Sequence, residues 1–169
     1  MMQNVSGDEV LLEYFDDLLQ APVSPAAKQP SDYFVFFWGR LKLAFDKTKL
    51  QGVSDFPDSY AANSGKRLLG ITQYQGSTVP VIDLAEFLLT PGTRARDSGF
   101  NDNYGFLIIL SGGVAALPCH RVVGVQNIAG SDIRLRSDRT TRTWLLGTSL
   151  GQQCAILDIP GLLAGIDKM

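Results

Sequence analysis

Short runs of aromatic and β-branched residues recur along most of this chain, and Gly, Asn, Asp or Ser interrupts them about every ten residues. This spacing is typical of small barrels and sandwiches, because each run has the length of one strand and each interruption can form a tight turn. The pattern predicts an all-β body with minor helices. The expected strands cover residues 33–38, 41–46, 49–54, 68–75, 78–83, 104–110, 114–119, 121–128, 143–149 and 153–158.

Two of the expected strands end in an aspartate that is followed by a leucine-rich stretch. Asp83 precedes residues 84–89, and Asp158 precedes residues 159–166. An aspartate in this position can cap the first turn of a helix, so we expect a short helix in both places. The shared order of β-rich run, aspartate and leucines is a weak internal repeat, and it indicates two similar subdomains.

The N-terminal residues have a different pattern. Residues 6–20 predict a helix, because Ser6 and Glu9 have capping-box spacing and an apolar stripe follows the helical repeat. Two interpretations stay open: the stripe packs on its own domain, or the helix is a tethered peptide for a partner's groove. An anionic membrane surface would repel it. Its polar face is wholly acidic: Asp8, Glu9, Glu13, Asp16 and Asp17.

A proline-rich stretch separates this helix from the body. Residues 20–31 hold three prolines and little to bury, which predicts a semi-extended linker. We therefore divide the chain into residues 1–31, an acidic amphipathic helix with its linker, and residues 32–169, a folded domain.

Composition excludes several classes of protein. Hydrophobic residues make up 45% of the chain, charged residues 19%, and the formal net charge is −2. These values argue against a disordered chain, and the lack of basic excess argues against a nucleic-acid partner. One histidine and two cysteines are too few for a tetrahedral zinc site without carboxylates, and we expect neither metal nor cofactor.

No stretch of the sequence predicts membrane insertion. The most apolar region, residues 104–130, is interrupted by polar residues and Pro118 well before it reaches the length of a span. The N-terminus also lacks the basic and apolar pattern of a signal peptide. We expect a cytoplasmic protein.

Two groups of residues could carry chemistry. Cys119 and His120 are a nucleophile and a base next to each other, but successive residues of a strand point to opposite faces and cannot form a dyad. We therefore expect no catalytic residue here, and interpret Cys119 as a buried cysteine. Four arginines crowd the stretch after Asp132; they predict a solvated rim or a charged docking surface. They are Arg134, Arg136, Arg139 and Arg142.

The order of the segments resembles that of the CheW family. The resemblance covers residues 33–166 and rests on FVFFWGRLKLAFD, LLGITQYQGSTVPVIDLAEFL, YGFLIILSGGVAALPCHRVVGV and WLLGTSLGQQCAILDIPGLL. Its most specific part is the block from Leu69 to Leu84, which contains the G-x-x-V-P pattern followed by two apolar residues and Asp-Leu. The resemblance implies two intertwined five-stranded β-barrels that share a hydrophobic core.

The resemblance also implies a function. CheW-like proteins are adaptors without catalytic activity that bind the cytoplasmic tips of chemoreceptors and the regulatory domain of the histidine kinase CheA. Carried onto this chain, the receptor groove would involve Leu50, Gly52, Tyr74 and Gln75. A second, partner-docking position would fall at His120 and Arg121. Recruitment to membrane-associated receptor arrays would follow.

This chain departs from the family pattern at those positions. Coupling members usually carry arginine in place of Gln75, and an acidic residue often stands in place of Gly52. Residues 119–121, here Cys-His-Arg, replace a stretch that usually reads valine, aspartate and any residue. The loss of an arginine removes charge-assisted hydrogen bonds, so weaker receptor binding is expected.

Two alternatives to a coupling adaptor follow. The first is an auxiliary CheW-like interaction protein of the array or the cell pole that does not bind receptors in the usual way. The second is an enzyme or small-ligand barrel that uses Cys119, and it requires a lowered thiol pKa.

Overall fold

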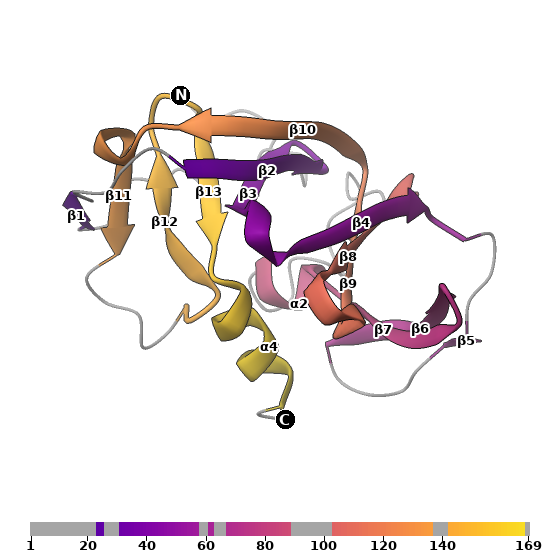
Figure 1. Ribbon diagram of the computed structural model, residues 1–169. Coiled ribbons are helices and arrows are strands. Elements are labelled where there is room, and N and C mark those ends of the chain that lie inside the picture. The colour runs from indigo at the N-terminus through magenta and orange to yellow at the C-terminus, as the bar shows by residue number, and fades with distance from the viewer. Residues whose placement is uncertain are drawn as a thin grey trace, which may run out of the picture.

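The computed structural model describes residues 23–25, 31–57, 61–62, 67–88, 103–136 and 142–167, and they are organised around two β-sheets (Figure 1). The first is seven-stranded, in the order β1 (Val23–Pro25), β11 (Ile133–Arg136), β12 (Leu145–Ser149), β13 (Cys154–Leu157), β3 (Leu41–Asp46), β2 (Ser31–Trp38) and β10 (Arg121–Ile128). The second is six-stranded, in the order β4 (Leu50–Asp55), β8 (Phe106–Leu110), β9 (Ala116–Cys119), β7 (Ser77–Ile82), β6 (Leu68–Tyr74) and β5 (Ala61–Ala62).

The chain passes between the sheets twice. β1 to β3 belong to the first sheet, β4 to β9 to the second, and β10 to β13 to the first again. The 3-10 helix η1 (Lys47–Lys49) makes the first crossing, and His120 alone joins β9 to β10 at the second. One parallel pair in each sheet, β13 with β3 and β7 with β9, joins strands that are distant in sequence. The two sheets are therefore interleaved along the sequence.

A shared hydrophobic core lies between the sheets. Phe34, Phe36 and Phe45 contribute aromatic rings whose centroids lie 5.7 to 6.4 Å apart, and Trp38 is fully buried beside them. Residues of β8, β9 and β13 complete the same cluster. The alternate residues of β2, among them Val35, pack into a second cluster. β2 is therefore buried on both faces, which accounts for its unbroken apolar run.

The two expected helices are present and carry the expected caps. α2 (Ala85–Leu88) begins where Asp83 Oδ1 accepts a hydrogen bond from Ala85 N at 3.2 Å. α4 (Ile159–Asp167) begins where Asp158 Oδ1 accepts one from Gly161 N at 3.3 Å. In Figure 1, α4 continues from the end of β13 toward the C-terminus. The repeat of strand, aspartate and leucines thus has the same local structure in both places.

The expected pair of closed five-stranded barrels is not found. Over the described ranges both sheets are open, because β1 and β10 end the first sheet, and β4 and β5 end the second, without pairing with each other. Each sheet is also larger than expected, because β1 and β11 extend the first sheet at one end and β5 extends the second. Strands as short as these have few residues in which an alternating pattern can develop, so the sequence does not predict them.

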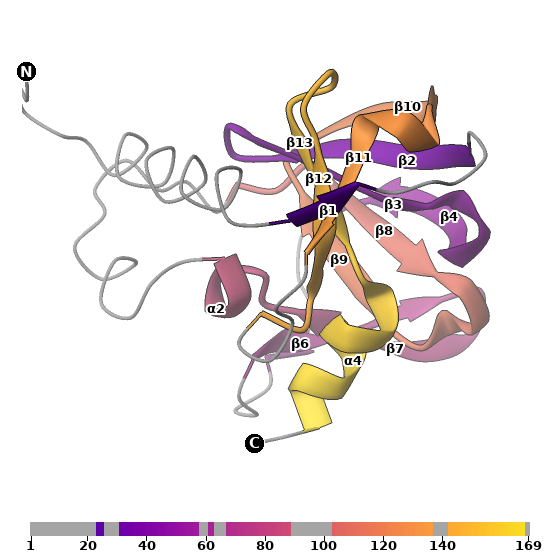
Figure 2. The same ribbon diagram turned by 90° about the vertical axis from the view of Figure 1, so that its left-hand side faces the viewer.

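The N-terminal prediction is only partly within the described residues. The expected helix at 6–20 lies outside them. Val23–Pro25, inside the expected linker at 20–31, forms β1 and pairs antiparallel with β11 (Figure 2). Within the ranges described above, no helix is long and apolar enough to cross a membrane.

Candidate partner-docking sites

Gly52 and Tyr74 meet although their strands are not neighbours. β4 is the first strand of the six-stranded sheet and β6 is the fifth. A Cβ atom added to Gly52 would nevertheless lie 2.5 Å from the hydroxyl oxygen of Tyr74. The sheet therefore curls until these two strands approach, and the missing side chain at residue 52 leaves room for the tyrosine ring.

Gln75 stands at the tip of the β6–β7 hairpin. Tyr74 pairs with Ser77, so the loop has two residues, Gln75 with φ +50° and Gly76 with φ +82°. Two successive positive φ values are typical of a type I′ turn, which matches the twist of the flanking strands. The exposed Gln75 side chain folds back, and its Nε2 donates to Tyr74 Oη at 3.4 Å.

The structure thus brings together three of the four residues that were expected in a receptor groove; Gly52, Tyr74 and Gln75 form what we call the Tyr74 cluster. Leu50 lies two residues before Gly52 on β4, across a β-bulge. Its half-buried side chain packs against the shared core. Leu50 therefore anchors the strand below the cluster.

His120 is fixed where the chain crosses between the sheets. Its backbone N–H donates to Phe37 O at 3.0 Å, and its Nδ1 accepts from Gly39 N at 2.7 Å. The imidazole ring also lies 4.9 Å from the ring of Tyr104, centroid to centroid. These contacts hold the second crossing in place and leave the ring half-buried.

Arg121 begins an exposed edge strand. Its guanidinium carbon lies 4.3 Å above the ring centroid of Phe37, a cation–π contact. The next outward-facing residues of β10, Val123 and Val125, are 42% and 45% exposed, and β10 is the last strand of its sheet. The sequence alone does not distinguish these valines, because the alternation of β10 does not reveal that the strand is at an edge.

The two cysteines are buried and poorly ionised. Burial raises the pKa of Cys119 to about 12, and a backbone hydrogen bond with Arg121 offsets this only in part. Burial also raises the pKa of Cys154 to about 11, with Lys42 opposing the rise and Asp132 adding to it. A nucleophilic thiol needs the opposite shift. The lowered pKa that an enzyme using Cys119 would require is therefore contradicted.

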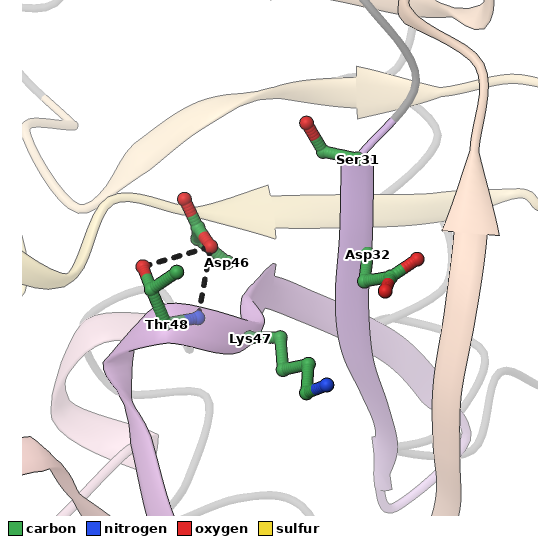
Figure 3. A pocket seen from close by; sticks show the side chains of 5 residues that line it. All are labelled: Ser31, Asp32, Asp46, Lys47 and Thr48. Carbon is green, nitrogen blue, oxygen red and sulfur yellow. Dashed lines mark hydrogen bonds between the residues drawn. The ribbon is translucent and has the colours of Figure 1, made fainter.

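A polar depression of about 410 Å³ lies where β2 begins and β3 ends (Figure 3). Asp46 Oδ1 accepts hydrogen bonds from both Thr48 N and Thr48 Oγ1 at 2.9 Å, as the dashed lines show. Asp32 Oδ1 accepts from Asn127 Nδ2 at 3.1 Å. Asp46 thus caps η1 at the first crossing. In the described part of the chain, no three His, Cys, Asp or Glu residues are grouped so that they could hold a metal ion.

The expected solvated rim of arginines is wrong at one position. Arg134 is exposed, but Arg136 is buried, with 8% of its surface exposed. The sequence places both arginines on one face of β11, and the pattern alone does not show that the end of this strand is covered. Arg142 is half-buried, and Arg139 lies outside the described residues.

The family is decided by a match over most of the chain: the model of the CheW-like domain matches residues 32–167. The chain belongs to the CheW-like family. A crystal structure of the scaffolding protein TtCheW from Thermoanaerobacter tengcongensis is similar to this CheW-like fold, with a TM-score of 0.60 and 21% sequence identity. The similarity covers 77% of this chain and 90% of that chain, and at this identity it shows the fold alone. No curated protein matches this CheW-like chain.

Proposed function

We propose that this CheW-like protein is a non-enzymatic adaptor of bacterial chemosensory signalling that couples chemoreceptors to the histidine kinase CheA. The family match over residues 32–167 carries the proposal. In this role the protein works in the cytoplasm and is recruited to membrane-associated receptor arrays. Residues 1–31 are then an addition to the adaptor domain at 32–169, joined to the sheet of that domain through β1.

The receptor tip binds beside the Tyr74 cluster. Gln75 is exposed at the hairpin tip, and the ring of Tyr74 extends over Gly52 on the facing strand. These groups give a receptor helix an aromatic surface and a hydrogen-bonding amide from two strands that are far apart in the sheet. Leu50 supports this surface from the core side.

The regulatory domain of CheA binds at the start of β10. Arg121 supplies a positive charge, and Val123 and Val125 supply exposed apolar contacts on β10, the last strand of its sheet within the described residues. Such an edge combines backbone hydrogen bonds with apolar anchors, as strand-addition interfaces do. The hydrogen bonds of His120 hold the beginning of this strand in position.

Calorimetric titration with the CheA regulatory domain and with a receptor-tip fragment tests the proposal. We expect both to bind with micromolar Kd, and Arg121→Glu to weaken kinase binding at least tenfold while receptor binding is kept. Lys49→Glu, an equal charge change at another exposed position, serves as the control. Absence of binding by either partner at several times that concentration would refute coupling.

A second candidate function is an auxiliary CheW-like protein of the array or cell pole that does not bind receptors in the usual way. The observation that favours it is the neutral Gln75 where coupling members usually carry arginine. Gln75→Arg should raise receptor-tip affinity by about one to two powers of ten if the Tyr74 cluster is used, because a charge-assisted hydrogen bond contributes about 1.5 to 3 kcal/mol.

Gln73→Arg is the matched control for that variant, since residue 73 is exposed on the same strand and the charge change is the same. An equal gain from both variants would reflect general charge attraction. No gain from Gln75→Arg, with kinase binding intact, would favour the auxiliary function.

A further inference from the structure

Two of the three guanidinium nitrogens of Arg136 are buried without a hydrogen-bond acceptor among the described residues. Its Nε and Nη1 atoms have no hydrogen-bond partner within the part of the chain that the structure describes. Thr148, on the neighbouring strand β12, has a buried Oγ1 that also lacks a hydrogen-bond partner within that part of the chain. Thr148 is paired with Arg134, which stands two residues before Arg136, so the three side chains share one face of the sheet.

An anionic hydrogen-bond acceptor would stabilise an arginine whose buried N–H groups lack partners. Removing a guanidinium group from water is costly unless hydrogen-bond acceptors replace the lost water, and a carboxylate matches its planar donors best. The exposed Arg134 on the same face adds a second positive charge. The face formed by Arg134, Arg136 and Thr148, which we call the arginine face, is therefore suited to an acidic segment.

β1 brings such a segment to this face. Val23 is paired with Arg136, and Pro25 with Arg134, so β1, which follows the acidic segment in the sequence, lies beside the strand of the two arginines. Asp16 and Asp17 come shortly before Val23 in the sequence. Even a fully extended chain from Asp16 to Val23 spans at most about 25 Å. Residues 6–20 contain five acidic residues and no lysine or arginine.

We propose that the acidic segment at residues 6–20 docks on the arginine face of its own domain, with Asp16 and Asp17 as acceptors for Arg136 and Arg134. The tether favours this occupant, because a short linker gives the segment a millimolar effective concentration at the face. Of the two interpretations of the N-terminal segment, this agrees with docking on its own domain, but the contact is made by acidic residues and not by the apolar stripe. The proposal is independent of receptor and kinase binding.

A double-mutant cycle on the full chain tests the ion pair. Asp16→Asn with Asp17→Asn should lower the thermal unfolding midpoint by about 3 °C or more. The same change should have little effect in an Arg136→Met background, which removes the buried charge and keeps an apolar side chain of similar length. Asp55→Asn, at an exposed position on β4, is the control for loss of a carboxylate. Equal losses in both backgrounds would overturn the proposal.

A distance measurement tests the docking itself. The native thiols are buried with raised pKa, so a nitroxide at Ser6→Cys labels one site. We expect it to broaden amide signals of β11 and β12 more than those of β6 and β7. Asp16→Lys with Asp17→Lys should abolish the difference, and adding Arg134→Glu should restore part of it. Uniform broadening, or broadening that grows with protein concentration and so reports a second copy, would overturn the proposal.

Discussion

At the scale of single residues, Gly52 is the point where two distant strands come closest. The atom that an added Cβ would meet is the far end of a tyrosine side chain, at 2.5 Å, and that end can move. Gly52→Ala should therefore cost less than about 1 kcal/mol of unfolding free energy, and less again in a Tyr74→Phe background that lacks the hydroxyl. Chemical denaturation of the single and double variants measures both values.

Gly147→Ala is the matched comparison. There an added Cβ would overlap the backbone carbonyl oxygen of Arg134, and the backbone cannot withdraw without breaking the β11–β12 ladder. We expect a loss of about 1 to 3 kcal/mol. If Gly52→Ala is as costly as Gly147→Ala, the tyrosine is held rigidly and our account of the Tyr74 cluster is wrong.

The buried cysteines make stability depend on pH. Folding raises the pKa of Cys119 to about 12 and that of Cys154 to about 11 from an ordinary 9.0, so the folded protein retains protons that the unfolded chain releases. The contribution of the two buried thiols to the free energy of unfolding is complete below about pH 9, and it is lost as the pH rises toward 11 and 12. Each thiol adds a slope of up to about 1.4 kcal/mol per pH unit.

Urea unfolding at pH 8, 9 and 10 measures that slope. Replacing both cysteines by alanine lowers stability at every pH through lost packing, but it should flatten the decline between pH 9 and 10. Burial, Asp46 and, least of the three, Cys154 also raise the pKa of Tyr33. Burial and Asp46 are the same in both proteins, so most of the tyrosine's contribution cancels in the comparison. Identical slopes would contradict the prediction.

Residue positions were predictable only where the pattern is local. Asp83 and Asp158 were expected as caps because a cap acts on the next residues of the chain, and both act so. The approach of Gly52 to Tyr74 depends on the curl of a whole sheet, and only the family resemblance placed the two together. The burial of Arg136 depends on what covers its strand, which alternation within that strand does not encode.

At the scale of elements, the β6–β7 hairpin carries a turn that its sequence fits imperfectly. A type I′ turn favours asparagine followed by glycine, because asparagine tolerates positive φ better than other non-glycine residues. Gln75 with φ +50° is therefore strained, whereas Gly76 is not. Gln75→Asn should stabilise the protein by about 0.5 to 1 kcal/mol.

Thermal unfolding, with Gln73→Asn as the control on the same strand, measures this gain. Residue 73 is within β6, where positive φ is not required, so asparagine should give no stabilisation there. A loss of stability from Gln75→Asn would show that the contact of Gln75 with Tyr74 outweighs the backbone strain.

The elements that were predicted correctly have strong patterns of their own. All the expected strands correspond to observed strands, with ends that shift by up to two residues. β1 and β5, with three and two residues, exist only because a longer strand offers them its edge. Their sequences alone specify no strand, and so the size and the open edges of the sheets could not be foreseen.

At the scale of the whole molecule, the two sheets depend on one core. Leu43 on β3 is fully buried in that core and pairs with Ala155 of β13. Leu43→Ala should therefore cost about 2 to 5 kcal/mol and should accelerate amide hydrogen exchange in β8 and β9 as well as in its own sheet. Val53→Ala, at an exposed position, is the control. Faster exchange confined to the seven-stranded sheet would show that the sheets unfold separately.

The interleaved order of the strands also has a consequence during synthesis. β2 and β3 leave the ribosome early with Phe34, Phe36 and Phe45 on their surface, but β10 and β13, their neighbours on either side, are translated last. At ordinary elongation rates this interval lasts on the order of ten seconds. The nascent protein thus displays an aromatic hairpin without lateral partners throughout that time, which is the kind of segment that ribosome-associated chaperones shield.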